Sequence, residues 1–363
     1  MRLISIQRCE AGMVLAQPIC TDQGTILLNT DMKLTDSIIE RLKQKGINTI
    51  YIRDEATEDI EIEEAVSQKT RQTAMKVIYQ GFSEIIQAEK KWKARLSPST
   101  AAAFRNVFEM ILNDLKKNGK AIGLLSDMYI QDHYVYAHSL NVAIYAAALG
   151  LELGYTDKEL LELGIGAMLH DIGKLMIPEE ILYKPGRLTD DEFATMKQHA
   201  EYGFDYLRQQ QGIPLLAAHC AFQHHERLDG TGYPRALRGD QIHKYARLLS
   251  VCDVFDALTT NRVYRRAMLP HDAMEIIFAG TGTHFEPAIV EAFRKTIAIY
   301  PIGLTVTLNT GAVGIVVDYN RNLPSRPVVR VIQHTDGSKA EPYYEVDLSK
   351  ELNITVVECE AIL

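Results

Sequence analysis

The feature that most constrains this chain is a nearly unbroken series of helical patterns between residues 120 and 300. Segments such as YVYAHSLNVAIYAAALG repeat their apolar residues at helical spacing. The segment LTDDEFATMKQHAEYGFDYLRQ opens with a capping box from Thr189 to Glu192, and DKELLELGIGAMLHDIG reads as one helix that ends at Gly173. We therefore predict a mainly α protein whose central domain, residues 120–300, is a helical bundle.

Different patterns flank this bundle. Residues 1–58 combine short apolar segments with one helix that starts near Thr35, which predicts a small α+β domain. Residues 59–119 read as a long helical linker, and their apolar spacing fits either packing within the chain or a dimer seam between two copies. Residues 301–363 change to period two, which predicts a small all-β, barrel-like module of about five strands.

Charge and cysteine content narrow the expected partners and compartment. Lys plus Arg is 39 and Asp plus Glu is 47, so the net charge of −8 disfavours binding to nucleic-acid polymers or membrane surfaces. We find no signal-peptide pattern and no window with the roughly 18 apolar residues of a membrane span. The five cysteines are widely spread and form no CxxC pair, as is typical of reduced thiols. We expect a cytoplasmic protein with no nucleic-acid polymer and no membrane as partner.

Histidines and aspartates of the helical region carry the chemical information. Taken singly, His138 or His199 is more often a hydrogen-bonded core residue, and Asp253 in the apolar run LLSVCDVFDAL could pair with Arg247. Taken together, five histidines and two aspartates fall on successive helices of one bundle, an arrangement that commonly builds di-metal sites. The set comprises His138, His170, Asp171, His199, His224, His225 and Asp253.

The ligand types indicate which ions and which reaction to expect. Imidazole and carboxylate without thiolate favour iron, manganese or similar ions, and this many donors suits two ions that share a bridging carboxylate, for which we predict Asp171. Two ions about 3.5–4 Å apart can clamp the attacking and leaving oxygens of phosphoryl transfer. Lys174 is a candidate phosphate contact or a solvated lysine. Arg262, Arg265 and Arg266 are candidate sources of local positive charge, with solvent exposure as the alternative.

At this point the residues resemble a known family. The series His138, HDIGK, His199, HHERLDGTGYP and Asp253 is similar to the HD-GYP phosphodiesterases, a branch of the HD-domain phosphohydrolases. The resemblance covers about residues 125–300, and HHExxDGxGYP at this distance after HDxGK is very specific. It implies an HD-type helical bundle and an enzyme that hydrolyses cyclic di-GMP to pGpG and often on to GMP.

The resemblance also implies residue roles. The family's metal ligands fall on the seven histidines and aspartates named above, and Lys174 matches a phosphate-contacting lysine. Two divalent ions are expected, because Tyr134 stands where some members place a glutamate that binds a third. Gly230 is expected to permit a sharp turn through φ values closed to other residues, as is Gly232. The expected substrate contacts beyond Lys174 are Gly232, Tyr233, Pro234, Arg262 and Arg265.

The expected mechanism has a metal-bridging hydroxide attack one phosphodiester in line while the ions and Lys174 neutralise its oxygens. Asp132 is a candidate proton donor to the leaving ribose oxygen, or else a surface carboxylate without a chemical role. Other functions stay open: a phosphodiesterase for cyclic GMP-AMP, a receptor that holds cyclic di-GMP without cutting it, and an interaction scaffold. A homodimer through residues 59–119 is a further possibility.

Overall fold

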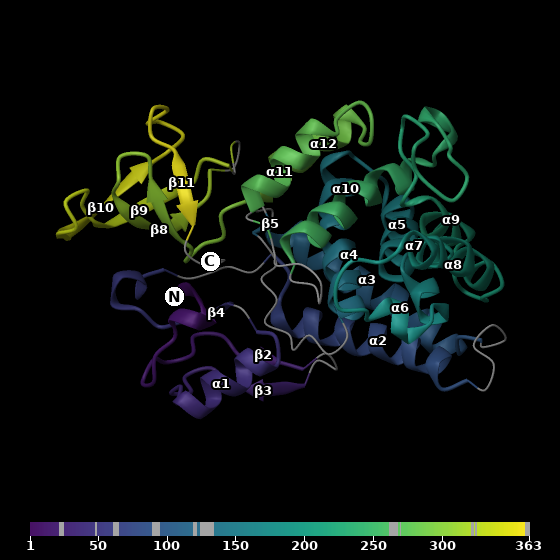
Figure 1. Ribbon diagram of the computed structural model, residues 1–363, viewed down its shortest axis with the longest axis horizontal. Coiled ribbons are helices and arrows are strands. Elements are labelled where there is room, and N and C mark those ends of the chain that lie inside the picture. The colour runs from purple at the N-terminus through teal and green to yellow at the C-terminus, as the bar shows by residue number, and fades with distance from the viewer. Residues whose placement is uncertain are drawn as a thin grey trace. The chain divides into compact units, whose positions relative to one another are not determined.

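The computed structural model describes residues 1–21, 25–47, 49–60, 65–88, 95–118, 122–123, 134–260, 268, 270–320, 323 and 325–359. The chain divides into two compact units, and each unit draws on separate stretches of sequence (Figure 1). The first comprises Met1–Ala65, Lys120–His133 and Arg294–Leu363, and the second comprises Val66–Gly119 and Tyr134–Phe293. No helix among the described residues is both long enough and apolar enough to cross a membrane.

The second unit is helical, as the sequence predicts. Helix α4 is its central element: every residue from His138 to Gly150 is buried, which is typical of a helix that is apolar on all sides. Capping boxes at Thr156 and Thr189 begin α5 and α7. The helices are α2 (Gln68–Ile86), α3 (Pro98–Asn118), α4 (Tyr134–Glu152), α5 (Asp157–Leu169), α6 (Glu179–Leu182), α7 (Asp190–Lys197), α8 (His199–Leu207), α9 (Leu215–Gln223), α10 (Lys244–Thr259), α11 (Pro270–Ala279) and α12 (Pro287–Thr296).

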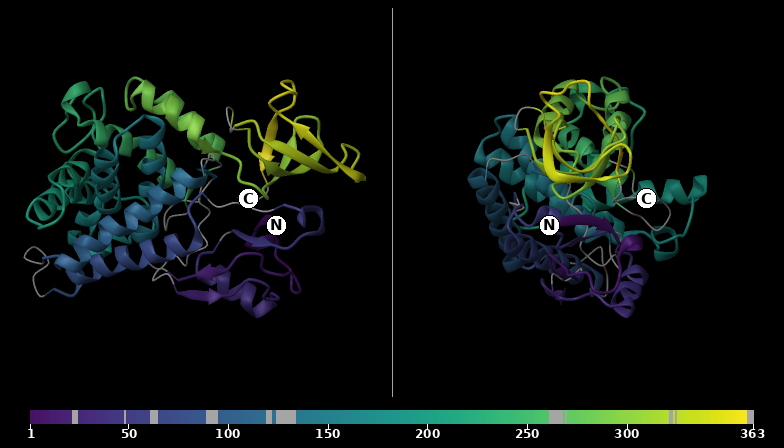
Figure 2. Two further views of the ribbon diagram at one scale, coloured as in Figure 1. Left: turned by 180° about the vertical axis from the view of Figure 1, so that it is seen from behind. Right: turned by 90° about the vertical axis from the view of Figure 1, so that its left-hand side faces the viewer.

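Helices α2 and α3 lie side by side in this unit (Figure 2). A Cβ atom added at Gly81 of α2 would lie 2.7 Å from the Phe104 ring of α3, so the glycine permits this close contact. Ile78 and Phe82 of α2 are fully buried, as is Phe108 of α3. The apolar spacing of residues 59–119 is therefore used for packing within the chain, and a homodimer through this segment stays a prediction.

The helix expected to end at Gly173 ends earlier. Helix α5 stops at Leu169, His170 is its C-cap, and the chain continues as a 3-10 helix over Ile172–Met176. A Cβ atom at Gly173 would lie 1.9 Å from the carbonyl oxygen of His199 and 2.5 Å from the amide nitrogen of Gly203. The chain must therefore leave α5 before Gly173, because α8 packs directly against its backbone.

Replacement of Gly173 by alanine is expected to lower the free energy of unfolding by about 1–3 kcal/mol, because a methyl group here meets backbone atoms that cannot move independently. Urea denaturation would measure the change. Gly203→Ala is the matched control on the other side of the contact, since its nearest neighbour would be the Ala221 side chain at 3.1 Å. Equal losses in both variants would contradict this account.

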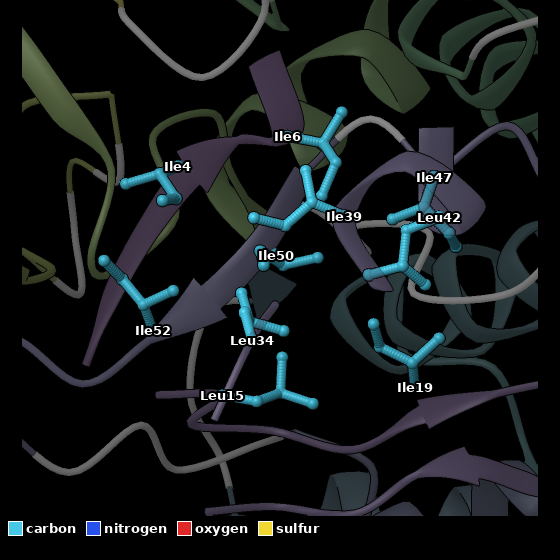
Figure 3. Packing of buried hydrophobic residues seen from close by; sticks show 10 residues of the cluster. All are labelled: Ile4, Ile6, Leu15, Ile19, Leu34, Ile39, Leu42, Ile47, Ile50 and Ile52. Carbon is cyan, nitrogen blue, oxygen red and sulfur yellow. The ribbon is translucent and has the colours of Figure 1, made fainter. Parts of the chain in front are cut away.

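The first unit begins with an α+β segment that has its own small core. Strand β1 (Arg2–Ser5) pairs antiparallel with β4 (Thr49–Ile52), and β2 (Ile19–Cys20) pairs with β3 (Ile26–Leu28). Helix α1 (Asp36–Gln44) begins where the Thr35 hydroxyl accepts a hydrogen bond from the Ile38 amide. Figure 3 shows the core residues Ile4, Ile6, Leu15, Ile19, Leu34, Ile39, Leu42, Ile47, Ile50 and Ile52.

The same unit contains a C-terminal antiparallel sheet of five strands in the order β10-β9-β8-β7-β11. The strands are β7 (Thr305–Leu308), β8 (Val313–Asp318), β9 (Val328–Gln333), β10 (Lys339–Asp347) and β11 (Val356–Cys359). Strand β5 (Ile122–Gly123) pairs in parallel with β6 (Ile297–Ala298). The small all-β module is confirmed, whereas its closure into a barrel stays a prediction.

Hydrogen bonds join the two ends of the chain within this first unit. The Leu3 amide donates to the Gly303 carbonyl at 2.8 Å, and the Arg2 guanidinium donates to the Thr305 hydroxyl at 3.0 Å. Arg330 on β9 contacts the Asp59 carboxylate at 2.6 Å and the Glu345 carboxylate at 2.8 Å. The α+β segment and the C-terminal strands therefore fold as parts of one unit.

Candidate metal centre

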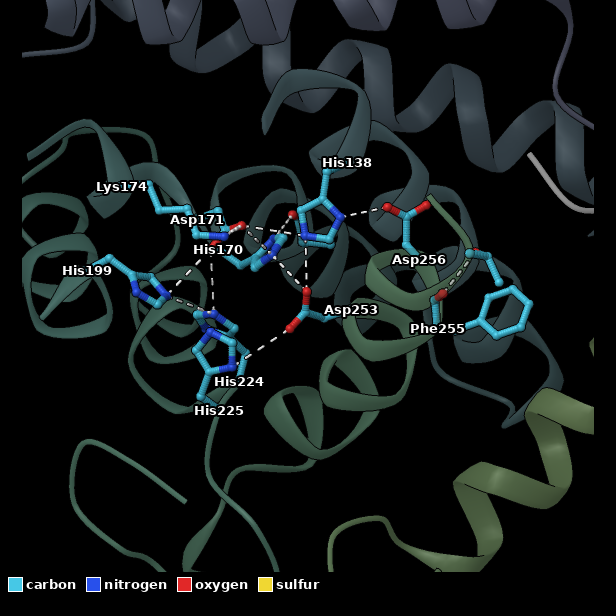
Figure 4. A network of polar contacts seen from close by, with 12 residues as sticks. His138, His170, Asp171, Lys174, His199, His224, His225, Asp253, Phe255 and Asp256 are labelled. Atoms are coloured by element: carbon cyan, nitrogen blue, oxygen red, sulfur yellow. Dashed lines mark hydrogen bonds and ion pairs between the residues drawn. The ribbon is translucent and has the colours of Figure 1, made fainter. Parts of the chain in front are cut away.

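The seven predicted metal ligands converge on one buried site of the helical unit (Figure 4). His138 projects from α4, Asp253 projects from α10, and His199 is the first residue of α8. The other four follow helix ends: His170 and Asp171 follow α5, while His224 and His225 follow α9. Helix ends and helix faces thus bring together residues that are up to 115 positions apart in the sequence (253 − 138).

Hydrogen bonds at one ring nitrogen orient four of the histidines. The Nδ1 atoms of His170 and His199 lie 2.7 Å from the carbonyl oxygens of Ala167 and Met196, and the Nδ1 atom of His224 lies 2.9 Å from that of Ala221. The Nδ1 atom of His138 instead lies 2.7 Å from the Asp256 carboxylate. These contacts make Nδ1 the donor and turn each Nε2 atom toward the cluster, as in metal-bound histidines.

Asp171 lies between two groups of these rings. Its Oδ2 atom is 3.5 Å from Nε2 of His138 and 3.4 Å from Nε2 of His170. Its Oδ1 atom is 3.5 Å from Nε2 of His199 and 3.7 Å from Nε2 of His224. The two carboxylate oxygens therefore face different histidine pairs, which is the geometry required of a bridging ligand.

Asp253 and His225 are the remaining two predicted ligands, and Asp253 contacts both His138 and His225. Oδ1 of Asp253 lies 3.0 Å from Nε2 of His138, and its Oδ2 lies 3.8 Å from Nδ1 of His225. Arg247, the alternative partner for Asp253, contacts Asp240 and Glu286 instead. Asp253 therefore belongs to the cluster.

The polar atoms of this site fit a cation. Nε2 of His170 and Oδ1 of Asp171 are buried and have no hydrogen-bond partner. Buried polar atoms without partners are rare because each costs free energy. Ligand atoms of Asp171, His199, His224 and His225 all lie within 4.8 Å of one another, as do those of His138, His170 and Asp171. A divalent cation would satisfy these atoms, and the donor set suits iron or manganese.

Protonation states also favour cation binding. Burial lowers the pKa of His199 to about 4 and that of His224 to about 3, so both rings are neutral near pH 7. Burial would raise the pKa of Asp171, yet the Lys174 ammonium and His170 hold it well below its usual value. Burial likewise lowers the pKa of His138, but the carboxylates of Asp253 and Asp256 raise it to about 9. The site thus presents anionic carboxylates and, at His199 and His224, neutral imidazoles, whereas His138 must give up a proton before its Nε2 can bind a cation.

Lys174 belongs to the site and is not a solvated lysine. Its ammonium donates to Oδ2 of Asp171 at 2.5 Å, and the residue is buried. It also lines a pocket of about 410 Å³ that reaches His199, His225 and Tyr233. A bound anion in this pocket would meet a positive charge next to the cluster.

The loop that carries the GYP triplet turns against His225. The Glu226 carboxylate accepts hydrogen bonds from the amides of Arg235 at 2.7 Å and Leu237 at 2.9 Å, which holds the loop closed. Tyr233 stacks on the His225 ring with centroids 4.7 Å apart and lines the pocket. The pocket lining does not include Gly232 or Pro234.

The two loop glycines are needed for different reasons. Gly230 has a φ of +79°, as predicted. The same expectation was wrong for Gly232, which does not have a positive φ. Its constraint is steric, because a Cβ atom there would lie 2.4 Å from the Arg227 amide nitrogen.

Some predicted site residues lie outside the described part of the chain. These are Asp132, Arg262 and Arg265, together with Arg266. The side chain of Tyr134 is also outside it. The structure therefore gives no geometry for the predicted proton donor or for the predicted arginine contacts.

Sequence reasoning missed Asp256. Its carboxylate is buried and holds His138. The sequence did contain a signal for this role. Asp256 follows Asp253 by three residues on the same helix, and this spacing puts both carboxylates on one face.

Two family models match this chain, one over the helical bundle and one over the C-terminal strands. Residues 122–289 match the HD domain, and residues 305–362 match a KOW domain associated with HD domain. The helical bundle with its buried His–Asp cluster is thus an HD domain. It is of the HD-GYP type, as the HDIGK and HHERLDGTGYP motifs indicated.

Curated relatives support this assignment. A cyclic di-GMP phosphodiesterase of Pseudomonas aeruginosa is 37% identical over 219 residues, which cover 60% of this chain and 53% of the relative. A 3'3'-cGAMP-specific phosphodiesterase of Vibrio cholerae is 34% identical over 219 residues, which cover 59% and 42%. A cyclic di-GMP phosphodiesterase of Thermotoga maritima is 36% identical over 206 residues, which cover 56% and 55%. The chain therefore spans about half the length of these relatives.

Proposed function

We propose that this protein is a metal-dependent phosphodiesterase that hydrolyses cyclic di-GMP to pGpG, with GMP as the product of any second hydrolysis. The observation that carries the proposal is Asp171, whose two oxygens face separate histidine pairs within 3.7 Å or less. This geometry supports two ions, iron or manganese, with Asp171 as their bridge. His138, His170 and Asp253 would hold one ion, and His199, His224 and His225 would hold the other.

When bound, such ions would generate hydroxide from water at neutral pH and neutralise charge on the phosphate. The protein's own residues would orient and stabilise the substrate. Lys174 would exchange part of its contact with Asp171 for a phosphate oxygen and stabilise the negative charge that builds up there. Tyr233, held against His225, would border the bound nucleotide. We also propose that Asp132 donates a proton to the leaving ribose oxygen. Arg262 and Arg265 would contact the ligand.

The test is turnover of cyclic di-GMP by anaerobically purified protein loaded with ferrous iron or manganese, with products separated by chromatography. Cyclic GMP-AMP would be assayed in parallel, because a relative specific for 3'3'-cGAMP is 34% identical. We expect cyclic di-GMP to be the better substrate. Tight binding of cyclic di-GMP without turnover would identify a receptor. If the protein neither binds nor hydrolyses these dinucleotides, the interaction scaffold is the function that remains.

Replacement of Asp256 by alanine is expected to weaken metal binding by about 10- to 100-fold, because the His138 ring would lose the partner that fixes its tautomer and orientation. Metal content after dialysis against buffers of set free manganese would measure the change. Asp272→Ala, at a half-exposed carboxylate on α11, is the matched control. Unchanged affinity in the Asp256 variant would show that His138 does not depend on this contact.

A further inference from the structure

The pocket beside the metal centre has two chemically different sides. One side is polar and presents Lys174, His199 and His225. Most of the other lining residues come from residues 181–196, a segment that the mechanism above does not use and that also contributes Lys184, Arg187 and Asp190. Its apolar members that line the pocket are Ile181, Leu182, Leu188, Phe193 and Met196. This lining suits a ligand that joins an anionic group to a flat or apolar group.

Phe193 is the distinctive residue of the apolar side. It is 47% exposed, which is unusual for a phenylalanine that lines a pocket. Its ring lies 6.4 Å from that of Tyr233 in an edge-on arrangement, and the Lys197 ammonium lies 5.1 Å from its centre. An exposed aromatic ring with a cation nearby is a platform on which nucleobases stack.

The charged residues that line this part of the pocket are Lys184, Arg187 and Asp190, and the carboxylate among them suits a base. Lys184 lies at the same wall, but its ammonium is held by both carboxylate oxygens of Glu192, at 2.8 and 2.6 Å. Asp190, the first residue of α7, lines the pocket and is exposed. A carboxylate repels phosphate. It can accept hydrogen bonds from N1–H and the exocyclic amino group of guanine, whereas adenine presents an acceptor at N1.

We infer that residues 181–196 form a guanine subsite in which Phe193 stacks on the base and the Asp190 carboxylate selects guanine over adenine. The inference rests on the proposed function, because it takes the bound phosphodiester to lie at the metal centre. The pocket volume of about 410 Å³ is within the range of roughly 300–1,000 Å³ that is common for ligand sites. Phe193 and Asp190 are therefore specificity-determining residues for the substrate.

The first variant to measure is Phe193→Ala. Loss of one stacking platform is expected to raise KM for cyclic di-GMP by at least about tenfold, with kcat and metal content little changed. Phe193→Trp is expected to restore KM, because a larger ring also stacks. Phe278→Ala is the matched control, since Phe278 is 38% exposed on α11 and lies outside the pocket lining.

The second variant is Asp190→Asn. It is expected to reduce the preference for cyclic di-GMP over cyclic di-AMP by about tenfold, because an amide accepts less strongly from guanine and can donate to adenine. The preference would be measured as the ratio of the kcat/KM values for the two cyclic dinucleotides on manganese-loaded protein, or by calorimetry on the same protein if the parent binds them without hydrolysis.

These measurements separate this inference from the proposed function. If the parent hydrolyses cyclic di-GMP while Phe193→Ala behaves like Phe278→Ala, the guanine subsite is wrong and the proposed function stands. If the parent binds cyclic di-GMP through Phe193 but does not hydrolyse it, the subsite stands and the proposed activity is wrong. Absence of both binding and hydrolysis would overturn both.

Discussion

Asp171→Asn protein is expected to turn over cyclic di-GMP at least about 1,000-fold more slowly than the parent. The variant keeps the shape of the side chain but removes the negative charge that faces both histidine pairs. In the proposed mechanism Asp171 bridges the two ions, so its replacement would remove several kcal/mol of charge stabilisation in the transition state, and each 1.36 kcal/mol corresponds to tenfold in rate. Initial rates with saturating manganese would measure the effect.

Asp205→Asn is the matched control for this variant. Asp205 lies on α8 in an exposed ion pair with Arg208, so its replacement removes a carboxylate without touching the cluster. The control is expected to keep the parent rate. Circular dichroism would establish that the Asp171 variant is folded. A folded Asp171→Asn protein with the rate of the parent would remove Asp171 from the mechanism.

Addition of manganese to metal-free protein is expected to raise the free energy of unfolding by about 4 kcal/mol when free metal exceeds its dissociation constant 1,000-fold. The reason is that Nε2 of His170 and Oδ1 of Asp171 are buried without hydrogen bonds. A cation bound only by the folded chain gives these atoms a partner. Urea denaturation with and without manganese would measure the shift.

Asp171→Asn and Asp205→Asn serve again as a pair in this experiment. The first variant is expected to lose most of the metal-dependent stabilisation, and the second is expected to keep it. Stabilisation of equal size in the parent and in Asp171→Asn would mean that manganese binds elsewhere on the chain.

Much of the site could be predicted from sequence because each ligand carried its own chemical signal. A histidine or aspartate inside an apolar helix is costly without a partner, and the HDIGK and HHERLDGTGYP motifs gave these signals a common context. The cluster then brought together all seven predicted ligands. The helical bundle was equally clear, since its apolar spacing and capping boxes agree with one another.

What sequence reasoning missed depends on contacts between distant segments. Helix α5 ends at Leu169 because the backbone of α8 packs against Gly173, and no local sequence pattern reveals this contact. Asp256 reads as one more carboxylate until its contact with His138 is known. Phe193 reads as an ordinary apolar residue of α7, because periodicity does not tell whether a ring points into a core or into a pocket.

The joining of the two ends in one unit has a consequence for the order of folding. The hydrogen bond from Arg2 to Thr305 links side chains 303 positions apart. Since a ribosome makes the N-terminus first, the helical unit, Val66–Gly119 and Tyr134–Phe293, has been synthesised before this bond can form. The core of residues 4–52 can also assemble early, because all the described residues that form it lie between Ile4 and Ile52. Docking of the C-terminal strands onto β1 must then be among the last steps of folding. A chain that stops before residue 303 would leave the Leu3 amide without the Gly303 carbonyl that accepts its hydrogen bond.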